Sequence, residues 1–150
     1  MQLNEGNIIP EETLNDRINY SLNSLKKSKF RSKFHLTQKD RDYIAAKGLE
    51  IIKEHAFQII NSRVAPAFPK NDGKQTPMKN HPVFIAQHAT ATCCRGCISK
   101  WHGIGEGRVL DDAEVEFIVA LVMGWIERQV NEEMGWAVWE LIAKKAAWSF

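Results

Sequence analysis

The stretch LDDAEVEFIVALVMGWIERQ, residues 110–129, decides the fold class of this protein. Its apolar residues recur at the three- and four-residue spacing of an α-helix. Asp111 is a suitable N-cap, and Glu114 stands three positions later, which completes a capping box. We therefore predict a long helix across this stretch.

The same helical spacing recurs along the rest of the chain. It is clear in residues 10–30 and in residues 36–64, where Thr37 is a plausible N-cap. Residues 130–150 are amphipathic and Trp-rich, and a homo-oligomer would form through this C-terminal helix. Because no strand pattern of period two persists, we predict an all-α fold. We expect a single compact domain of five to six helices with one long functional loop at about residues 65–82.

Length and composition exclude several classes of protein. The chain has 150 residues, of which 44% are hydrophobic and 25% are charged, as in an ordinary globular domain. No apolar run approaches the ~20 residues of a membrane span, and the N-terminus has no signal-peptide pattern. We therefore expect a cytoplasmic protein with no membrane partner.

All three cysteines lie in HATATCCRGCISKWH, which runs from His88 to His102. Cys94 and Cys97 have the spacing that allows two thiolates to chelate one ion. Together with His88 and His102 they form the pattern H-x5-C-x2-C-x4-H, and Cys93 is an alternative ligand. We predict a zinc ion on this set, with a structural role because four protein ligands close the coordination sphere.

One continuous helix cannot assemble this ligand set. His88 and His102 would lie about 21 Å apart along its axis, and the cysteines would face away from both. The zinc hypothesis therefore requires a break, which we expect at Gly96 or Gly103. Without a break, the cysteines are buried small residues, and the segment is either purely structural or part of a metal-free interaction protein. The polar binding face of that interaction protein would consist of His88, Thr92, Arg95, Ser99 and His102.

Positive charge is concentrated between Ser24 and Arg41, which contain seven basic residues and one acidic residue. Phe30 and Phe34 are interleaved with these basic residues. A basic stretch with aromatic residues can follow a phosphate backbone and stack on bases. The alternative is a solvated helix face whose two phenylalanines pack on the core. The residues that we expect to contact DNA or RNA are Lys27, Lys29, Arg31, Lys33, Arg95 and Lys100.

The segment NDGKQTPMKNHPVFIAQHATATCCRGC, residues 71–97, and the KWHGI that follows it resemble a microbial family catalogued as domain of unknown function 4186. SKFRSKFHL and RVAPAFP also resemble that family. The resemblance implies a core domain at 26–129 between an N-terminal helical segment at 1–25 and a C-terminal extension at 130–150, all in one compact unit. It also implies that the long loop and the Cys/His stretch form one site, but it implies no catalytic residue.

The long loop suggests an enzymatic alternative. If it folds over the Cys/His stretch, Asp72, His81 and His88 can meet beside the metal. A metal with only three protein ligands keeps an open position, and an Asp–His pair next to it suits a metal-dependent hydrolase or nuclease. Asp72 and His81 are therefore the candidate catalytic residues.

Overall fold

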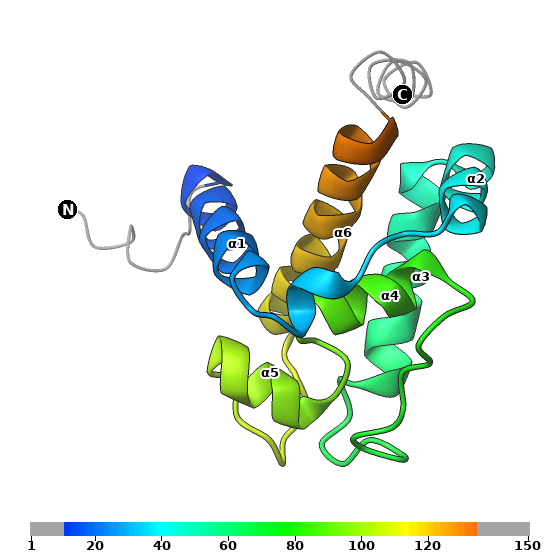
Figure 1. Cartoon of the computed structure of the whole chain (residues 1–150). Helices are drawn as coiled ribbons and strands as arrows, with labels where there is room; N and C mark the ends of the chain where they lie inside the picture. The colour runs from blue at the N-terminus through cyan, green and yellow to red at the C-terminus, as the bar shows by residue number, and fades with distance from the viewer. Residues whose placement is uncertain (1–10, 135–150) are drawn as a thin grey trace.

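The computed structural model describes residues 11–134. These residues form only helices and connecting segments, so the predicted all-α fold of five to six helices is confirmed (Figure 1). The remainder of the predicted C-terminal extension, residues 135–150, lies outside the described residues. The elements are α1 (Glu11–Lys26), the short 3-10 helix η2 (Arg31–Lys33), α2 (Gln38–Lys47), α3 (Leu49–Arg63), α4 (Pro82–Ala89), α5 (Arg95–His102) and α6 (Asp112–Met134).

Helix α6 is the central element, and α1, α3 and α4 pack around it (Figure 1). The predicted capping box at its start is confirmed. The Glu114 N–H donates to Asp111 Oδ1 over 2.8 Å, and the Asp111 N–H donates to Glu114 Oε1 over 3.0 Å. The fully buried side chains that α6 contributes to the core are Ile118, Leu121, Val122, Ile126 and Val130.

The helical pattern of residues 36–64 corresponds to two helices. Thr37 caps α2 as predicted, because its hydroxyl accepts from the Asp40 N–H over 3.1 Å while the Asp40 carboxylate accepts from the Thr37 N–H. Gly48 separates α2 from α3 with a φ of 87°, a backbone conformation that favours glycine. The chain therefore turns between α2 and α3.

The predicted long loop connects α3 to α4 and folds back on the end of α3. Arg63 Nη1 donates to the Gln75 carbonyl over 2.7 Å, and the Gln75 side chain donates to the Arg63 carbonyl over 3.3 Å. Gln75 is buried, and its amide also donates to Asp72 Oδ1 over 2.9 Å. These contacts fix the loop in one position beside the cysteine segment.

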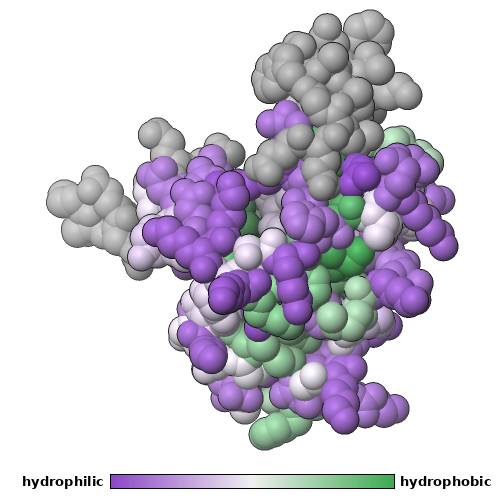
Figure 2. All heavy atoms as spheres, viewed as in Figure 1, coloured by the Kyte–Doolittle hydropathy of each residue, from purple (hydrophilic) through white to green (hydrophobic). Residues whose placement is uncertain are grey.

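Hydrophilic side chains cover much of the face in Figure 2, and a band of hydrophobic residues is exposed across its middle and lower part. None of the helices between residues 11 and 134 has the length and apolarity that crossing a bilayer requires.

Candidate metal centre

The cysteine segment is broken into two helices, but not where the sequence suggested. We expected the break at Gly96 or Gly103. Gly96 lies inside α5 and Gly103 ends it, whereas the break runs from Thr90 to Cys94 and includes Ala91 with a φ of 59°. The Thr90 hydroxyl donates to the Ala86 carbonyl over 2.8 Å, which helps to stabilise this turn.

The break brings all three cysteines together. Their sulfur atoms lie within 4.8 Å of one another, and this is the one group of three or more metal-ligating side chains at that distance between residues 11 and 134. Cys94 is the N-cap of α5, and its sulfur accepts from the Cys97 N–H over 3.4 Å. Cys93 precedes it and is buried, while Cys94 and Cys97 are half-buried. All three are free thiols.

Arg31 extends from η2 onto this cluster. Its Nη2 donates to Cys97 Sγ over 3.1 Å, and its Nη1 lies 3.8 Å from Cys93 Sγ and donates to the His88 carbonyl over 2.8 Å. The guanidinium also lies over the Phe30 ring, 4.9 Å from its centroid. Arg31 is only 9% exposed, and within residues 11–134 it makes no ion pair with a carboxylate. It is therefore a buried cation whose partners are one backbone carbonyl and two cysteine sulfur atoms.

The cluster has the chemistry and the dimensions to hold a metal ion. Thiolates bound tetrahedrally to one zinc ion at ~2.3 Å lie ~3.8 Å apart, so small side-chain rotations suffice to close the observed group. Burial raises the pKa of the Cys94 thiol to about 11, and the metal ion must therefore displace a proton from it. The start of α5 beneath the sulfurs adds the partial positive charge of a helix N-terminus, which favours thiolates.

The two histidines of the predicted ligand set lie outside the group of sulfur atoms. His88 Nε2 donates toward the carbonyls of Thr76 and Pro77, at 3.1 and 3.2 Å, and its ring stacks on Phe34. His102 Nε2 donates to the Thr90 carbonyl over 2.8 Å. In each ring Nε2 donates to a backbone carbonyl, and neither histidine belongs to the group of close ligand atoms, which consists of three sulfur atoms in place of the predicted two cysteines and two histidines.

The polar binding face that a continuous helix would present does not form. Thr92 and Arg95 have no exposed surface, and His88 is 9% exposed. The Arg95 guanidinium donates to the carbonyls of Val64, Pro66 and Gly105, at 3.3, 2.8 and 2.7 Å. Arg95 therefore holds the start of the long loop against the glycine-rich segment that precedes α6.

The loop does contact the cysteine segment, but it does not assemble the predicted catalytic group. Thr76 Oγ1 donates to the Cys93 carbonyl over 2.7 Å, and Asp72 Oδ1 accepts from the Arg95 N–H over 3.2 Å. His81 instead lies at the other end of α4, where its Nδ1 accepts from the Val83 N–H over 3.0 Å. Asp72, His81 and His88 therefore serve three different structural contacts.

His81 pairs with a histidine that the sequence did not single out. Its Nε2 lies 3.1 Å from His55 Nδ1, and Tyr43 packs against both rings. Because His81 Nδ1 accepts from a backbone N–H, Nε2 carries the hydrogen and donates to His55. Burial, followed by the charge of His55, lowers the pKa of His81 to about 4. His81 is thus a neutral capping residue.

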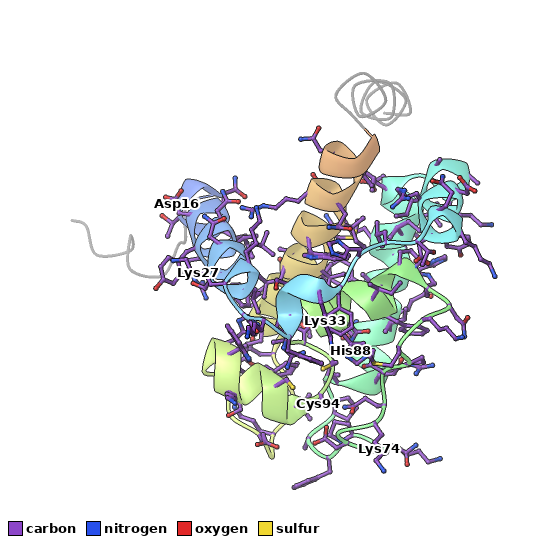
Figure 3. The ribbon with its side chains drawn as sticks, viewed as in Figure 1. Asp16, Lys27, Lys33, Lys74, His88 and Cys94 are labelled. Carbon is purple, nitrogen blue, oxygen red and sulfur yellow. The ribbon has the colours of Figure 1, made fainter. Side chains whose placement is uncertain are left out.

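The six residues expected to contact nucleic acid divide into two groups. Arg31 and Arg95 are buried and bonded inside the protein, so the expectation was wrong for these two. The side chains that remain available for contact, all exposed, are Lys27, Lys29, Lys33 and Lys100. Figure 3 labels Lys33, His88 and Cys94 near the place where η2, α4 and α5 meet, with Lys27 at the end of α1 and Lys74 on the long loop.

Sequence reasoning missed Arg31 as a partner of the cysteines, and it missed His55. Arg31 was noticed only for its charge, and 66 positions separate it from Cys97. His55 stands among the apolar residues of α3 with no motif around it. The one usable signal was that Arg31 lies between two phenylalanines, a position that suits a half-buried turn as well as a solvated one.

No solved structure matches this chain. Residues 19–127, which include η2, the long loop and the three cysteines, match the model of a family described as a domain of unknown function, DUF4186. The match spans the whole candidate metal centre and most of the protein, and the chain therefore belongs to the DUF4186 family.

Proposed function

We propose that this protein is a zinc-binding helical domain in which the thiolates of Cys93, Cys94 and Cys97 hold one zinc ion. The observation that carries this proposal is the approach of three sulfur atoms to within 4.8 Å of one another at the start of α5. Thiolates bound tetrahedrally to one zinc ion at ~2.3 Å lie ~3.8 Å apart, so a small inward movement of the side chains brings all three sulfur atoms onto one ion. Zinc suits thiolate ligands and needs no redox chemistry.

The charge of Arg31 supports a bound metal. Three thiolates on a divalent ion carry one net negative charge, which is costly to bury without a partner. The Arg31 guanidinium supplies one positive charge at 3.1 Å from Cys97 Sγ. Without a metal ion, the Arg31 guanidinium would be a poorly compensated cation beside three neutral thiols. The metal-loaded cluster and Arg31 therefore neutralise each other.

The number of ligands favours a second candidate, a metal-dependent hydrolase or nuclease. Structural zinc sites have four protein ligands, whereas catalytic sites have three and keep a position open for water or substrate. The three sulfurs fit the second pattern. Asp72 and His81 are bonded elsewhere, so this candidate requires a different residue, or the substrate itself, to move the proton.

Elemental analysis of protein purified without an affinity tag or chelator tests the metal proposal. We expect close to one zinc ion per chain, and we expect Cys97→Ala to lose it. A ligand present at 1,000 times its Kd stabilises the folded state by about 4 kcal/mol, so Cys97→Ala should also melt well below the parent. Protein that contains no metal after growth in zinc-supplemented medium, and that melts within a degree or two of Cys97→Ala, contradicts the proposal.

We also propose that the domain contacts nucleic acid through Lys27, Lys29 and Lys33. All three lysines are exposed. Lys27 and Lys29 lie on the segment that connects α1 to η2, and Lys33 ends η2, with its Nζ 4.6 Å from the centroid of the half-exposed Phe30 ring. An exposed aromatic ring among cations suits a single strand, where bases stack and phosphates pair with the charges.

Charge reversal tests this contact. The triple variant Lys27→Glu, Lys29→Glu, Lys33→Glu should lose binding to single-stranded DNA and RNA at low salt. The matched control reverses three exposed lysines of the long loop, Lys70, Lys74 and Lys79, and should bind as the parent does. Parent affinity should fall steeply with salt, because several phosphates are neutralised. Equal affinity of the two triple variants, or no binding by the parent, contradicts the proposal.

A further inference from the structure

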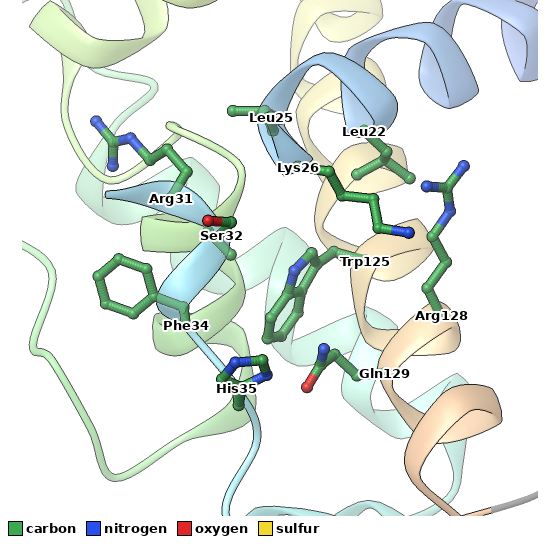
Figure 4. Close-up of a pocket in the computed structure, with 11 residues that line it drawn as sticks. Leu22, Leu25, Lys26, Arg31, Ser32, Phe34, His35, Trp125, Arg128 and Gln129 are labelled. Atoms are coloured by element: carbon green, nitrogen blue, oxygen red, sulfur yellow. The ribbon is translucent and has the colours of Figure 1, made fainter. Parts of the chain in front are cut away.

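A cavity of about 160 Å³ lies between α1, η2 and α6 (Figure 4). It is distinct from the cysteine cluster, although Arg31 belongs to both. Arg31 lines the cavity, but its guanidinium points away from Trp125 in Figure 4 and reaches Cys97. The proposed zinc site does not explain what this cavity does.

Among residues 11–134, the ionisable side chains that line the cavity are Lys26, Arg31, His35 and Arg128, and none of them is an aspartate or a glutamate. The Arg128 guanidinium is held by the side-chain oxygens of two asparagines of α1, at 2.9 and 3.1 Å, and no carboxylate of the described residues pairs with it. The Lys26 side chain is exposed, and no partner for it is found within residues 11–134. The cavity therefore attracts an anion.

Gln129 adds a fixed hydrogen-bond donor. This residue is 8% exposed, and its Oε1 accepts from the Leu36 N–H over 3.0 Å, which fixes the orientation of the amide. Nε2 is then the remaining polar atom of the side chain, and it makes no hydrogen bond within residues 11–134 but stays accessible to solvent. Figure 4 shows this nitrogen directed toward Trp125. Because the orientation of the amide is fixed, this N–H donor is available to an acceptor on a ligand.

Trp125 gives the cavity a flat apolar surface. Its half-buried indole occupies the centre of the view in Figure 4, with Lys26, Arg128, Gln129 and His35 around it. The rest of the apolar lining comes from Leu22, Leu25, Phe34 and Ala89. A cavity of this size holds about one small ring, because an engineered apolar cavity of ~150 Å³ accommodates benzene. The cavity thus pairs space for one ring with cations at its rim.

We infer that this cavity binds a nucleoside phosphate, with the base stacked on Trp125 and the phosphate between Lys26 and Arg128. Bases stack on aromatic side chains, and lysine and arginine bind phosphate through charge-assisted hydrogen bonds. Gln129 Nε2 donates to an acceptor of the ligand. The nucleotide is either free or one residue of a strand. The inference does not depend on the zinc site, and it extends the proposed nucleic-acid contact if the nucleotide belongs to a strand.

Calorimetric titration of the full chain tests the inference with AMP, UMP, adenosine and inorganic phosphate as probes. We expect saturable binding of AMP or UMP, with adenosine and phosphate each at least about tenfold weaker, because each lacks one half of the interaction. Lys26→Gln should weaken mononucleotide binding about tenfold, the usual effect of losing one charge-assisted hydrogen bond. Trp125→Leu should weaken it further, and Trp125→Phe should restore most of the affinity.

Two controls make the result specific to this cavity. Lys39→Gln removes another exposed lysine, on α2, and should bind AMP as the parent does. The triple variant at Lys27, Lys29 and Lys33 alters no residue that lines the cavity, so it should retain mononucleotide binding even if it loses strands. If a single-stranded pentanucleotide competes with the mononucleotide, the ligand is a nucleotide within a strand. If it does not compete, the ligand is a free nucleotide. No saturable mononucleotide binding at millimolar concentration, or equal binding by Lys26→Gln and Lys39→Gln, overturns the inference.

Discussion

The guanidinium of Arg31 donates a hydrogen bond to the sulfur of Cys97 over 3.1 Å, although 66 positions separate the two residues. A second N–H of the same guanidinium donates to the carbonyl of His88, at the end of α4. Arg31 thus connects η2, α4 and α5 at the thiol cluster. A cation in this position stabilises thiolates over thiols, and it therefore increases the affinity of these sulfur atoms for a metal ion.

Arg31→Gln should weaken zinc binding by about 10–100-fold, the usual effect of removing a residue that supports a metal ligand. The variant keeps two N–H donors but loses the charge that offsets the thiolates. Competition with a chromophoric chelator measures the affinity. Lys33→Gln, two positions along and exposed, should bind zinc as the parent does. Equal zinc affinity of Arg31→Gln and Lys33→Gln would show that the guanidinium does not act on the cluster.

Two variants separate the three-sulfur site from the four-ligand set that the sequence suggested. Cys93→Ala should lose zinc, because Cys93 is one of the three sulfurs. His102→Gln should retain zinc, because His102 lies outside the group of three sulfur atoms. Elemental analysis of both variants checks this. Zinc retained by Cys93→Ala and lost by His102→Gln would restore the ligand set with His102 and remove the three-sulfur site.

The fold was largely predictable because its determinants are local. Apolar spacing marks a helix within a few turns, and both predicted capping signals, at Thr37 and Asp111, need only three residues of sequence. The division between α2 and α3 at Gly48 has no such clear signal, because an isolated glycine is tolerated within a helix. Those local rules gave the fold class and the beginning of α6.

The site was only partly predictable because its determinants are distant in sequence. The Cys94–Cys97 spacing is local and was recognised. The left-handed backbone conformation at Ala91 is not set by local sequence, because alanine seldom adopts it and surrounding contacts hold it there. Burial of Arg95 depends on carbonyls of the long loop and of Gly105, which no pattern around residue 95 reveals. The position of the Arg31 guanidinium against the cysteine sulfurs also depends on tertiary contacts and not on its sequence neighbours.

Helix α1 packs closely on α6 because Gly124 has no side chain. A Cβ atom at this position would lie 3.2 Å from Leu22 Cδ1 and 3.3 Å from Ile18 Cγ2. Gly124→Leu should destabilise the protein by about 1–3 kcal/mol, the usual cost of overpacking. Gly124→Ala should change stability little, because the better helix propensity of alanine offsets the mild crowding. Urea denaturation measures both.

The matched control for this packing argument is Ala113→Leu, which adds a similar side chain to an exposed position of α6. It should leave the free energy of unfolding within about 0.5 kcal/mol of the parent. If Gly124→Leu is as stable as Ala113→Leu, the space between α1 and α6 tolerates a large side chain, and the close packing of the two helices does not depend on glycine.

His81 should make the protein less stable in mild acid. Its folded-state pKa of about 4 lies below the ordinary 6.5, chiefly because of burial. Between these two values the unfolded chain binds a proton that the folded chain does not, so stability falls as pH decreases from about 6.5 to 4. The full shift corresponds to about 3 kcal/mol, and solvent near the half-buried ring reduces this to about 1–2 kcal/mol.

His81→Asn isolates this contribution from that of the carboxylates. Asparagine is a good N-cap and can accept from the Val83 N–H as His81 Nδ1 does, but it does not titrate. Urea denaturation of parent and variant at intervals from pH 7 to pH 4 gives two stability curves. We expect the difference in unfolding free energy to shift by about 1–2 kcal/mol in favour of the variant as pH falls, because the carboxylates titrate in both proteins. Parallel curves would mean that His81 titrates alike in the folded and unfolded chains, and that its contact with His55 does not oppose protonation.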